Sequence, residues 1–405
     1  MRIRRIFFLS ILIVLFASVP AFASINFEVN GTPFKPNADY VLNNGVTYIE
    51  SSLINTVMGA DVDVTDQDVV ITHNNDKLVL TIGHSNALLN NDNINLSATP
   101  YQSNGITMLP LRTVLDNMGA KIGWNEAEST VLIDYVETRN DMLADDLLVE
   151  TSQLMNNLPS YDMDGTMKMQ MMMSGIEEEG FPLEIAMETD LYAHYEMEPL
   201  TVYIKQKVKM GDIPGMPPEA ADTEVESVLM EDKYYINMPG EGWIIMDLGP
   251  LGLDELMQSS LNQDPAEMLK QMQDFGMISN YGNDVTIDGQ KYWVINVTID
   301  QDKFNDEFEN IMSQFPVPQD EFADILSSMS LAMDYSSLIN TTTLMTDYID
   351  MDMTMGTSMA SPEENSSEVL DMTMKMNGRF NIKEAAKDFV LPDLSSAVEL
   401  PLLTD

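Results

Sequence analysis

Methionines that alternate with polar residues constrain the fold of this chain more than any other feature of its sequence. Only four of the 34 methionines precede residue 141. Successive side chains of a strand point to opposite faces, so a period of two places the methionines on one half-buried face and the Asp, Thr, Lys and Gln residues on the other. The pattern therefore predicts antiparallel strands with one wet face. The methionines expected to line the apolar face are Met163, Met167, Met169, Met171, Met351, Met353, Met355, Met372, Met374 and Met376.

Three roles for these methionines remain open. Methionine can be simple core filler, because its flexible side chain fits irregular gaps. The same flexibility suits an adaptable pocket for an acyl chain or another apolar ligand, where binding removes apolar area from water at about 25 cal/mol per Å² before the costs of association. The Met-x-Met runs at 351–355 and 372–376 also present soft thioethers, which favour Cu(I).

Helical patterns separate the extended segments of this second part of the chain. Leucines at 143, 147, 154 and 158 share one face of a helix expected over 143–158, and Pro159 ends it. Further helices are expected over 253–261, 266–275, 304–315 and 322–329, and hairpins over 234–245 and 285–297. Because helices and strands are segregated along the chain, the expected class is α+β, with helices covering one face of an antiparallel sheet.

An internal repeat organises residues 25–136. Asn-Gly-Val-Thr at 44–47 recurs as Asn-Gly-Ile-Thr at 104–107, and Met-Gly-Ala at 58–60 recurs at 118–120. Each unit is expected to hold an Asn-Gly turn, a short helix that ends on a left-handed glycine, and a closing hairpin. The repeat predicts a tandem-repeat α+β domain ahead of the methionine-rich part.

The second unit carries a resemblance to a known family. Residues 104–112, 118–125 and 131–133 together resemble the copper amine oxidase N-terminal-like domain, a module of many secreted and cell-surface bacterial proteins. The resemblance implies an accessory module that carries no redox centre and acts in adhesion or wall association. The first unit departs from the pattern at 49–52 and at Val64, which weakens a binding role there without threatening the fold.

The methionine-rich part, residues 140–405, carries a second resemblance. Its opening helix, the segment 161–167 and the pair 234–238 with Gly242-Trp243 resemble the outer-membrane lipoprotein carrier fold and its Gram-positive relatives. That resemblance implies a curved antiparallel sheet covered by helices, with a space between them that accepts acyl chains. The ten alternating methionines would then line the ligand site.

The first residues predict export. Arg2, Arg4 and Arg5 precede the apolar run 6–17, and Ala21-Phe22-Ala23 supplies a small-x-small cleavage site. Residues 1–23 are therefore interpreted as a signal peptide, and no later stretch reaches transmembrane length. The expected product is a secreted, cell-surface-associated protein with domains at 25–136 and 140–405.

Composition excludes several classes of function. The net charge of −45 disfavours nucleic acid as a partner, and the absence of cysteine excludes thiolate metal sites and a cysteine nucleophile. No catalytic motif is present, and His73, His84 and His194 are expected to be ordinary surface or partly packed residues. We therefore expect a non-catalytic protein without a cofactor or metal, whose partner is an apolar small molecule or lipid, or a component of the cell wall or surface.

Overall fold

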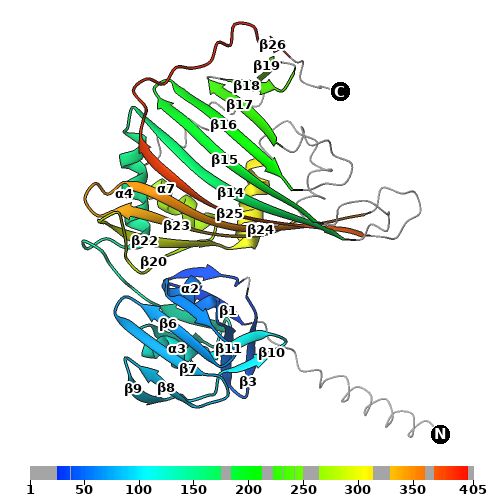
Figure 1. Cartoon of the computed structure of the whole chain (residues 1–405). Coiled ribbons are helices and arrows are strands. Elements are labelled where there is room, and N and C mark those ends of the chain that lie inside the picture. Colours follow the sequence, from blue (N-terminus) through cyan, green and yellow to red (C-terminus); the bar gives the residue numbers. More distant parts are fainter. Residues whose placement is uncertain are drawn as a thin grey trace, which may run out of the picture.

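The computed structural model describes residues 25–36, 38–174, 184–211, 222–230, 232–240, 242–249, 264–312, 329–360 and 369–399. The expected signal peptide at 1–23 lies outside these residues. Small sheets form the first part of the chain, and one large sheet dominates the second (Figure 1). The described residues are mostly strand, so the expected α+β class holds only in a coarser form: a sheet domain followed by a large sheet that carries few helices.

Three small sheets and two short helices build the first part. The helices α2 (Leu53–Met58) and α3 (Leu111–Asn117) pack with these sheets around one apolar core. In sheet order, the strands are β12 (Lys121–Asn125), β13 (Thr130–Asp134), β1 (Asn26–Val29) and β2 (Thr32–Phe34); β10 (Tyr101–Ser103), β11 (Ile106–Pro110), β4 (Val46–Glu50) and β3 (Tyr40–Asn43); and β5 (Asp61–Val64), β6 (Asp68–His73), β7 (Asp76–Thr81), β8 (Asn86–Leu89) and β9 (Asp92–Asn95).

Turn chemistry explains where these elements begin and end. The Asn-Gly pairs at 44–45 and 104–105 all have positive φ, between 51° and 83°, as a tight hairpin turn requires. Gly59 ends α2 in the left-handed conformation at φ 70°, and Gly119 follows α3 at φ 94°. Both helix ends were predicted from the repeat. Two equivalent tandem units stay a prediction. The strands β3, β4, β10 and β11 share one sheet, but the closing hairpins β5–β6 and β12–β13 join different sheets.

The second part is built on a continuous 13-stranded sheet. All its pairings are antiparallel except that of β19 with β26. Figure 1 shows the sheet curving around its helices. In sheet order, the strands are β20 (Met277–Tyr281), β22 (Gln290–Ile299), β23 (Met329–Asn340), β24 (Thr346–Ala360), β25 (Val369–Glu384), β14 (Ser160–Ser174), β15 (Glu184–Met197), β16 (Leu200–Met210), β17 (Asp222–Met230), β18 (Lys233–Met238), β19 (Gly242–Asp247) and β26 (Val398–Glu399), with β21 (Val285–Ile287) paired to β22.

Three of the expected helices of this part are present: α4 (Ala144–Asn156), α7 (Pro265–Asp274) and α8 (Gln301–Met312). Asp264 caps α7, because its side chain accepts hydrogen bonds from the backbone N–H groups of Ala266 and Glu267. The two expected hairpins are also present, as β18–β19 and β21–β22. The expected helix at 253–261 and most of the one at 322–329 lie outside the described residues.

The two parts are packed directly against each other. Ile278 of β20 is buried in the core cluster of the first part. Asn280 donates to the carbonyl of Thr56 at 2.8 Å, and Asn283 donates to the carbonyl of Thr72 at 3.0 Å. A Cβ added at Gly59 would lie 2.2 Å from the carbonyl oxygen of Tyr281. The end of α2 therefore needs glycine both for its backbone conformation and for this close approach.

Replacing Gly59 with Ala tests this junction, and Gly119→Ala is the matched control. Both variants place a side chain at a left-handed backbone position, but only Gly119 has no other atom within 4 Å of its added Cβ. We expect Gly59→Ala to lower the free energy of unfolding by about 1–3 kcal/mol more than Gly119→Ala does, because of the steric clash. Urea unfolding followed by circular dichroism measures both variants. Equal losses would mean that the two parts do not meet at Gly59.

Candidate functional site

A row of six methionines crosses the large sheet. Met333 of β23 lies opposite Met353 of β24, and Met353 lies opposite Met376 of β25. The row continues through Met169 of β14, Met187 of β15 and Met210 of β16, each paired in register with the one before it. Residues directly opposite in antiparallel strands share a face, with Cβ atoms about 4.5–5.5 Å apart. Six strands therefore present their methionines side by side on one face.

The neighbouring rows extend the same surface. Met355, Met374 and Met171 form the next row, which Leu331 and Ile185 flank. On the other side of the six-methionine row, Gly378 lies between Met351 and Met167. Tyr335 continues this row beyond Met351. We call this surface the methionine face. It holds all the predicted residues: Met163, Met167, Met169, Met171, Met351, Met353, Met355, Met372, Met374 and Met376.

Sequence reasoning placed each methionine run on one face of its own strand, and the register confirms that placement. It did not single out Met187, Met210 or Met333 as part of the same row. None of these residues belongs to a Met-x-Met run, so no local period marks them. The signal that could have found them is the pairing of strands, which a single sequence does not display.

The methionine face is half-buried rather than sealed. Met376 is 9% exposed, and the other predicted methionines have intermediate exposure. In the neighbouring core around α4, by contrast, Leu147 and Ile295 are fully buried. The opposite face of the same strands is exposed and polar, at residues such as Lys168, Gln170, Thr354, Lys375 and Asn377.

The methionine face is the side on which the helices lie. Tyr335 sits opposite Met351 in register and packs against the cluster that contains Leu147 of α4. The same cluster holds Ile295 and Ile339, which lie on that face of β22 and β23. Figure 1 shows α4 and α7 on the inner side of the sheet's curve. The apolar face is therefore the concave one.

Two of the histidines differ from the expectation of surface or partly packed residues. His84 is exposed, but His73 and His194 are only 3% and 4% exposed. His194 Nδ1 lies 2.6 Å from a carboxylate oxygen of Asp162, and the ring of Phe389 stacks on the imidazole. His73 likewise lies next to the carboxylate of Glu137. Each buried imidazole thus has a carboxylate partner, which lowers the cost of burying a polar ring.

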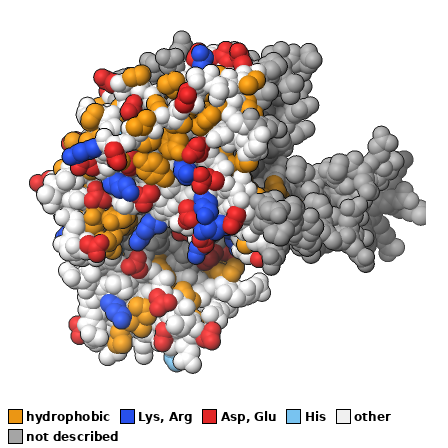
Figure 2. All heavy atoms as spheres, turned by 45° about the horizontal axis from the view of Figure 1, so that its top comes forward, with side chains coloured by type: hydrophobic (Ala, Val, Ile, Leu, Met, Phe, Trp, Pro, Cys, Tyr) orange, Lys and Arg blue, Asp and Glu red, His pale blue; other side chains and the backbone are white. Residues whose placement is uncertain are grey.

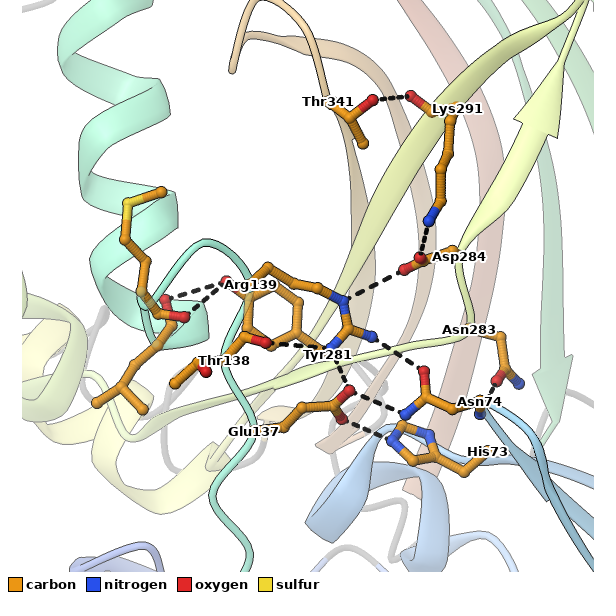
Figure 3. Close-up of polar contacts among 12 residues, drawn as sticks. His73, Asn74, Glu137, Thr138, Arg139, Tyr281, Asn283, Asp284, Lys291 and Thr341 are labelled. Carbon is orange, nitrogen blue, oxygen red and sulfur yellow. Dashed lines mark hydrogen bonds and ion pairs between the residues drawn. The ribbon is translucent and has the colours of Figure 1, made fainter.

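His73 belongs to a polar network that joins the two parts (Figure 3). Its Nε2 lies 2.7 Å from a carboxylate oxygen of Glu137, whose other oxygen accepts a hydrogen bond from Asn74 at 2.9 Å. Arg139 donates to Glu137 and lies 3.4 Å from Asp284 in the second part. Its guanidinium also lies over the ring of Tyr281, at 4.8 Å from the centroid. The network connects the end of β6 and the turn after it to the loop that follows β20.

Glu137 is the carboxylate at the centre of this network. Burial would raise its pKa, but the hydrogen bonds from His73, Arg139 and Asn74 outweigh that effect and lower the pKa from 4.5 to about 2. The network therefore stabilises the folded chain above pH 5, and this stabilisation is lost as the pH falls towards 2.

The outer face of the large sheet carries exposed ion pairs, and on the same face Tyr203, Val228 and Tyr235 form a buried apolar cluster. Figure 2 shows basic side chains next to acidic ones, with hydrophobic side chains between them. Each of these exposed ion pairs contributes little stability. They include Arg379 with Asp350, Lys383 with Asp164, Lys205 with Glu224 and Lys209 with Asp190.

Neither a metal centre nor a membrane helix is found in the described part of the chain. No group of three or more His, Cys, Asp or Glu residues there could hold a metal ion. Among the same residues, no helix has both the length and the apolar character that crossing a membrane requires.

Two protein families match separate parts of this chain. The copper amine oxidase N-terminal domain matches residues 28–133, which confirms the first resemblance. A family of unknown function, DUF6612, matches residues 143–394. A search of curated proteins finds no match.

Solved structures similar to this chain include three bacterial proteins. LprF from Mycobacterium bovis is 12% identical with a TM-score of 0.28, and the match covers 62% of this chain and 96% of that one. The lipoprotein LppX from Mycobacterium tuberculosis is 13% identical with a TM-score of 0.26, covering 56% and 92%. A putative outer membrane lipoprotein-sorting protein domain from Vibrio parahaemolyticus is 9% identical with a TM-score of 0.23, covering 61% and 94%.

Replacing Glu137 with Gln tests the junction network, and Glu126→Gln at an exposed site is the control. At pH 7 we expect the Glu137 variant to lose about 2–3 kcal/mol of unfolding free energy, because charge-assisted hydrogen bonds are removed. The difference from the wild type should shrink as the pH falls from 5 towards 2, because protonation then removes the same interactions. Urea unfolding across this pH range measures both effects. A difference that stays constant with pH would contradict the lowered pKa of Glu137.

Proposed function

The chain belongs to the DUF6612 family, whose function is unknown, and from that premise we propose that it is a non-catalytic envelope protein that binds a lipid or another apolar ligand on its methionine face. The observation that carries the proposal is the half-buried row from Met333 to Met210. The export signal expected at 1–23 supports a location at the cell surface.

The methionine face is apolar, continuous and incompletely covered. A sealed core would bury such side chains fully, as it does at Leu147 and Ile295. The methionine side chains have rotatable bonds and polarizable sulfur, so they can adapt to ligands of different shape. A ligand laid along the row would remove apolar area from water at about 25 cal/mol per Å², before the costs of association.

Met353→Asp tests this proposal, with Thr354→Asp as the matched control. The two residues are adjacent on β24, but Met353 lies on the methionine face and Thr354 on the exposed polar face. We expect saturable binding of a fluorescent fatty acid by the full chain. Met353→Asp should weaken this binding at least about tenfold, because a carboxylate resists burial against an acyl chain, whereas Thr354→Asp should leave it within about twofold.

Native mass spectrometry of freshly purified protein provides an independent readout of bound lipid. Absence of both co-purified lipid and saturable uptake would contradict ligand binding. If such a protein still remained attached to isolated cell walls, the result would support the alternative, a structural or adhesion module of the cell surface whose methionine face is sealed core. The copper amine oxidase N-terminal domain would then be the part that makes the attachment.

One observation also favours a second candidate, Cu(I) binding. Met353, Met376 and Met169 are paired in register on three adjacent strands, so their thioethers lie on one face within reach of one another. Thioether ligands select Cu(I) over harder cations. The Met-x-Met runs would supply further sulfur atoms from the rows on either side.

Replacing Met351, Met353 and Met355 together with Leu separates the two candidates. Leucine keeps the face apolar but removes the sulfur ligands, so fatty-acid binding should change less than about threefold. Competition with a Cu(I)-specific chelator measures the metal affinity of the full chain under reducing conditions. A copper role predicts that this affinity falls at least about tenfold in the triple variant. An unchanged affinity would exclude these methionines as ligands.

A further inference from the structure

A cavity lies in the first part of the chain, far in sequence from the methionine face. Its volume is about 470 Å³, which falls within the range of small-molecule sites. The wall of the cavity is largely apolar and includes Leu42, Val46, Arg112, Thr113 and Trp124. They come from four elements of this part, β3, β4, α3 and β12.

Arg112 is the unusual residue of this cavity. The chain carries 65 acidic residues against 20 basic ones, and the other two arginines of the described part pair with carboxylates. Arg112 forms no ion pair within the described part of the chain. Its Nη1 instead donates to the carbonyl oxygen of Ile122 at 2.8 Å, which holds the guanidinium at the wall of the cavity.

Trp124 and Leu42 supply exposed apolar surface beside this charge. Trp124 is 45% exposed and Leu42 is 56% exposed, although both are large hydrophobic residues. Ser97 and the largely buried Thr113 share a hydrogen bond between their hydroxyl groups at the same wall. The cavity thus combines a flat aromatic ring, aliphatic side chains, two hydroxyls and a cation that has no carboxylate partner among the described residues.

We propose that this cavity binds a small carboxylate with an apolar body. The carboxylate accepts hydrogen bonds from the free N–H groups of Arg112, whose fork-shaped guanidinium matches a carboxylate in geometry as well as charge. The apolar body covers Trp124 and Leu42 and removes their surface from water. An anion is the expected ligand because the guanidinium of Arg112 has no carboxylate partner among the described residues. The acidic remainder of the chain repels anions, so it offers no competing site.

Calorimetric titration of the full chain with 3-phenylpropanoate tests the proposal, with the neutral 3-phenylpropanamide as the matched probe. We expect saturable binding of the acid and at least about tenfold weaker binding of the amide, because the charge-assisted hydrogen bonds are lost. Arg112→Gln should lower the affinity for the acid to that for the amide, and Arg112→Lys should retain part of the difference. Lys121→Gln is the control, because Lys121 is an exposed cation of β12 outside this cavity.

Two further measurements locate the site. Binding should change the tryptophan fluorescence of the wild type, and Trp124→Phe should abolish that response while calorimetry still detects binding. Met353→Asp should leave the affinity unchanged, which separates this cavity from the proposed lipid site. Equal affinity for acid and amide, an Arg112→Gln variant that binds like the wild type, or no saturable binding of the acid would each overturn the proposal.

Discussion

Strand register in the large sheet is the constraint on which the rest of this structure depends. Residues that are paired in register point to the same face of the sheet. A residue on the inner face of β24 therefore lies beside residues on the inner faces of β23 and β25. A slip of one residue in any of these pairings would turn a whole set of methionines to the polar face. The pairing energy of the backbone and the burial of the thioethers therefore favour the same register.

The junction between the two parts has a different physical basis. Backbone groups approach closely at Gly59 and Tyr281, amide side chains such as Asn280 and Asn283 bridge to backbone carbonyls, and the ion-paired Glu137 and Arg139 lie beside them. Few apolar side chains are shared between the parts, with Ile278 as the clearest case. Such a junction depends on geometry and hydrogen bonding, so it specifies one arrangement of the parts more than it adds hydrophobic stability.

Charge divides the molecular surface into regions of different character. The outer face of the sheet pairs several of its cations with neighbouring carboxylates, as at Arg379 and Lys383. The methionine face carries thioethers in place of such pairs, and the cavity around Arg112 keeps a cation without a carboxylate partner among the described residues. The two proposed sites thus differ in what they select: apolar area at the first, and a carboxylate on an apolar body at the second.

The amino-acid sequence by itself determined the local structure of this protein. The period of two placed each methionine run on one face of a strand, the spacing of leucines predicted α4, and Asn-Gly pairs marked two hairpin turns. It also identified the copper amine oxidase N-terminal domain, because those motifs are local. Only the tertiary structure decided that Met187, Met210 and Met333 join the same row and that His73 and His194 are buried against carboxylates. It also decided that Arg112 forms no ion pair with the residues that the structure describes. These features depend on which distant segments pair and pack together, and such contacts leave no periodic signal in a single sequence.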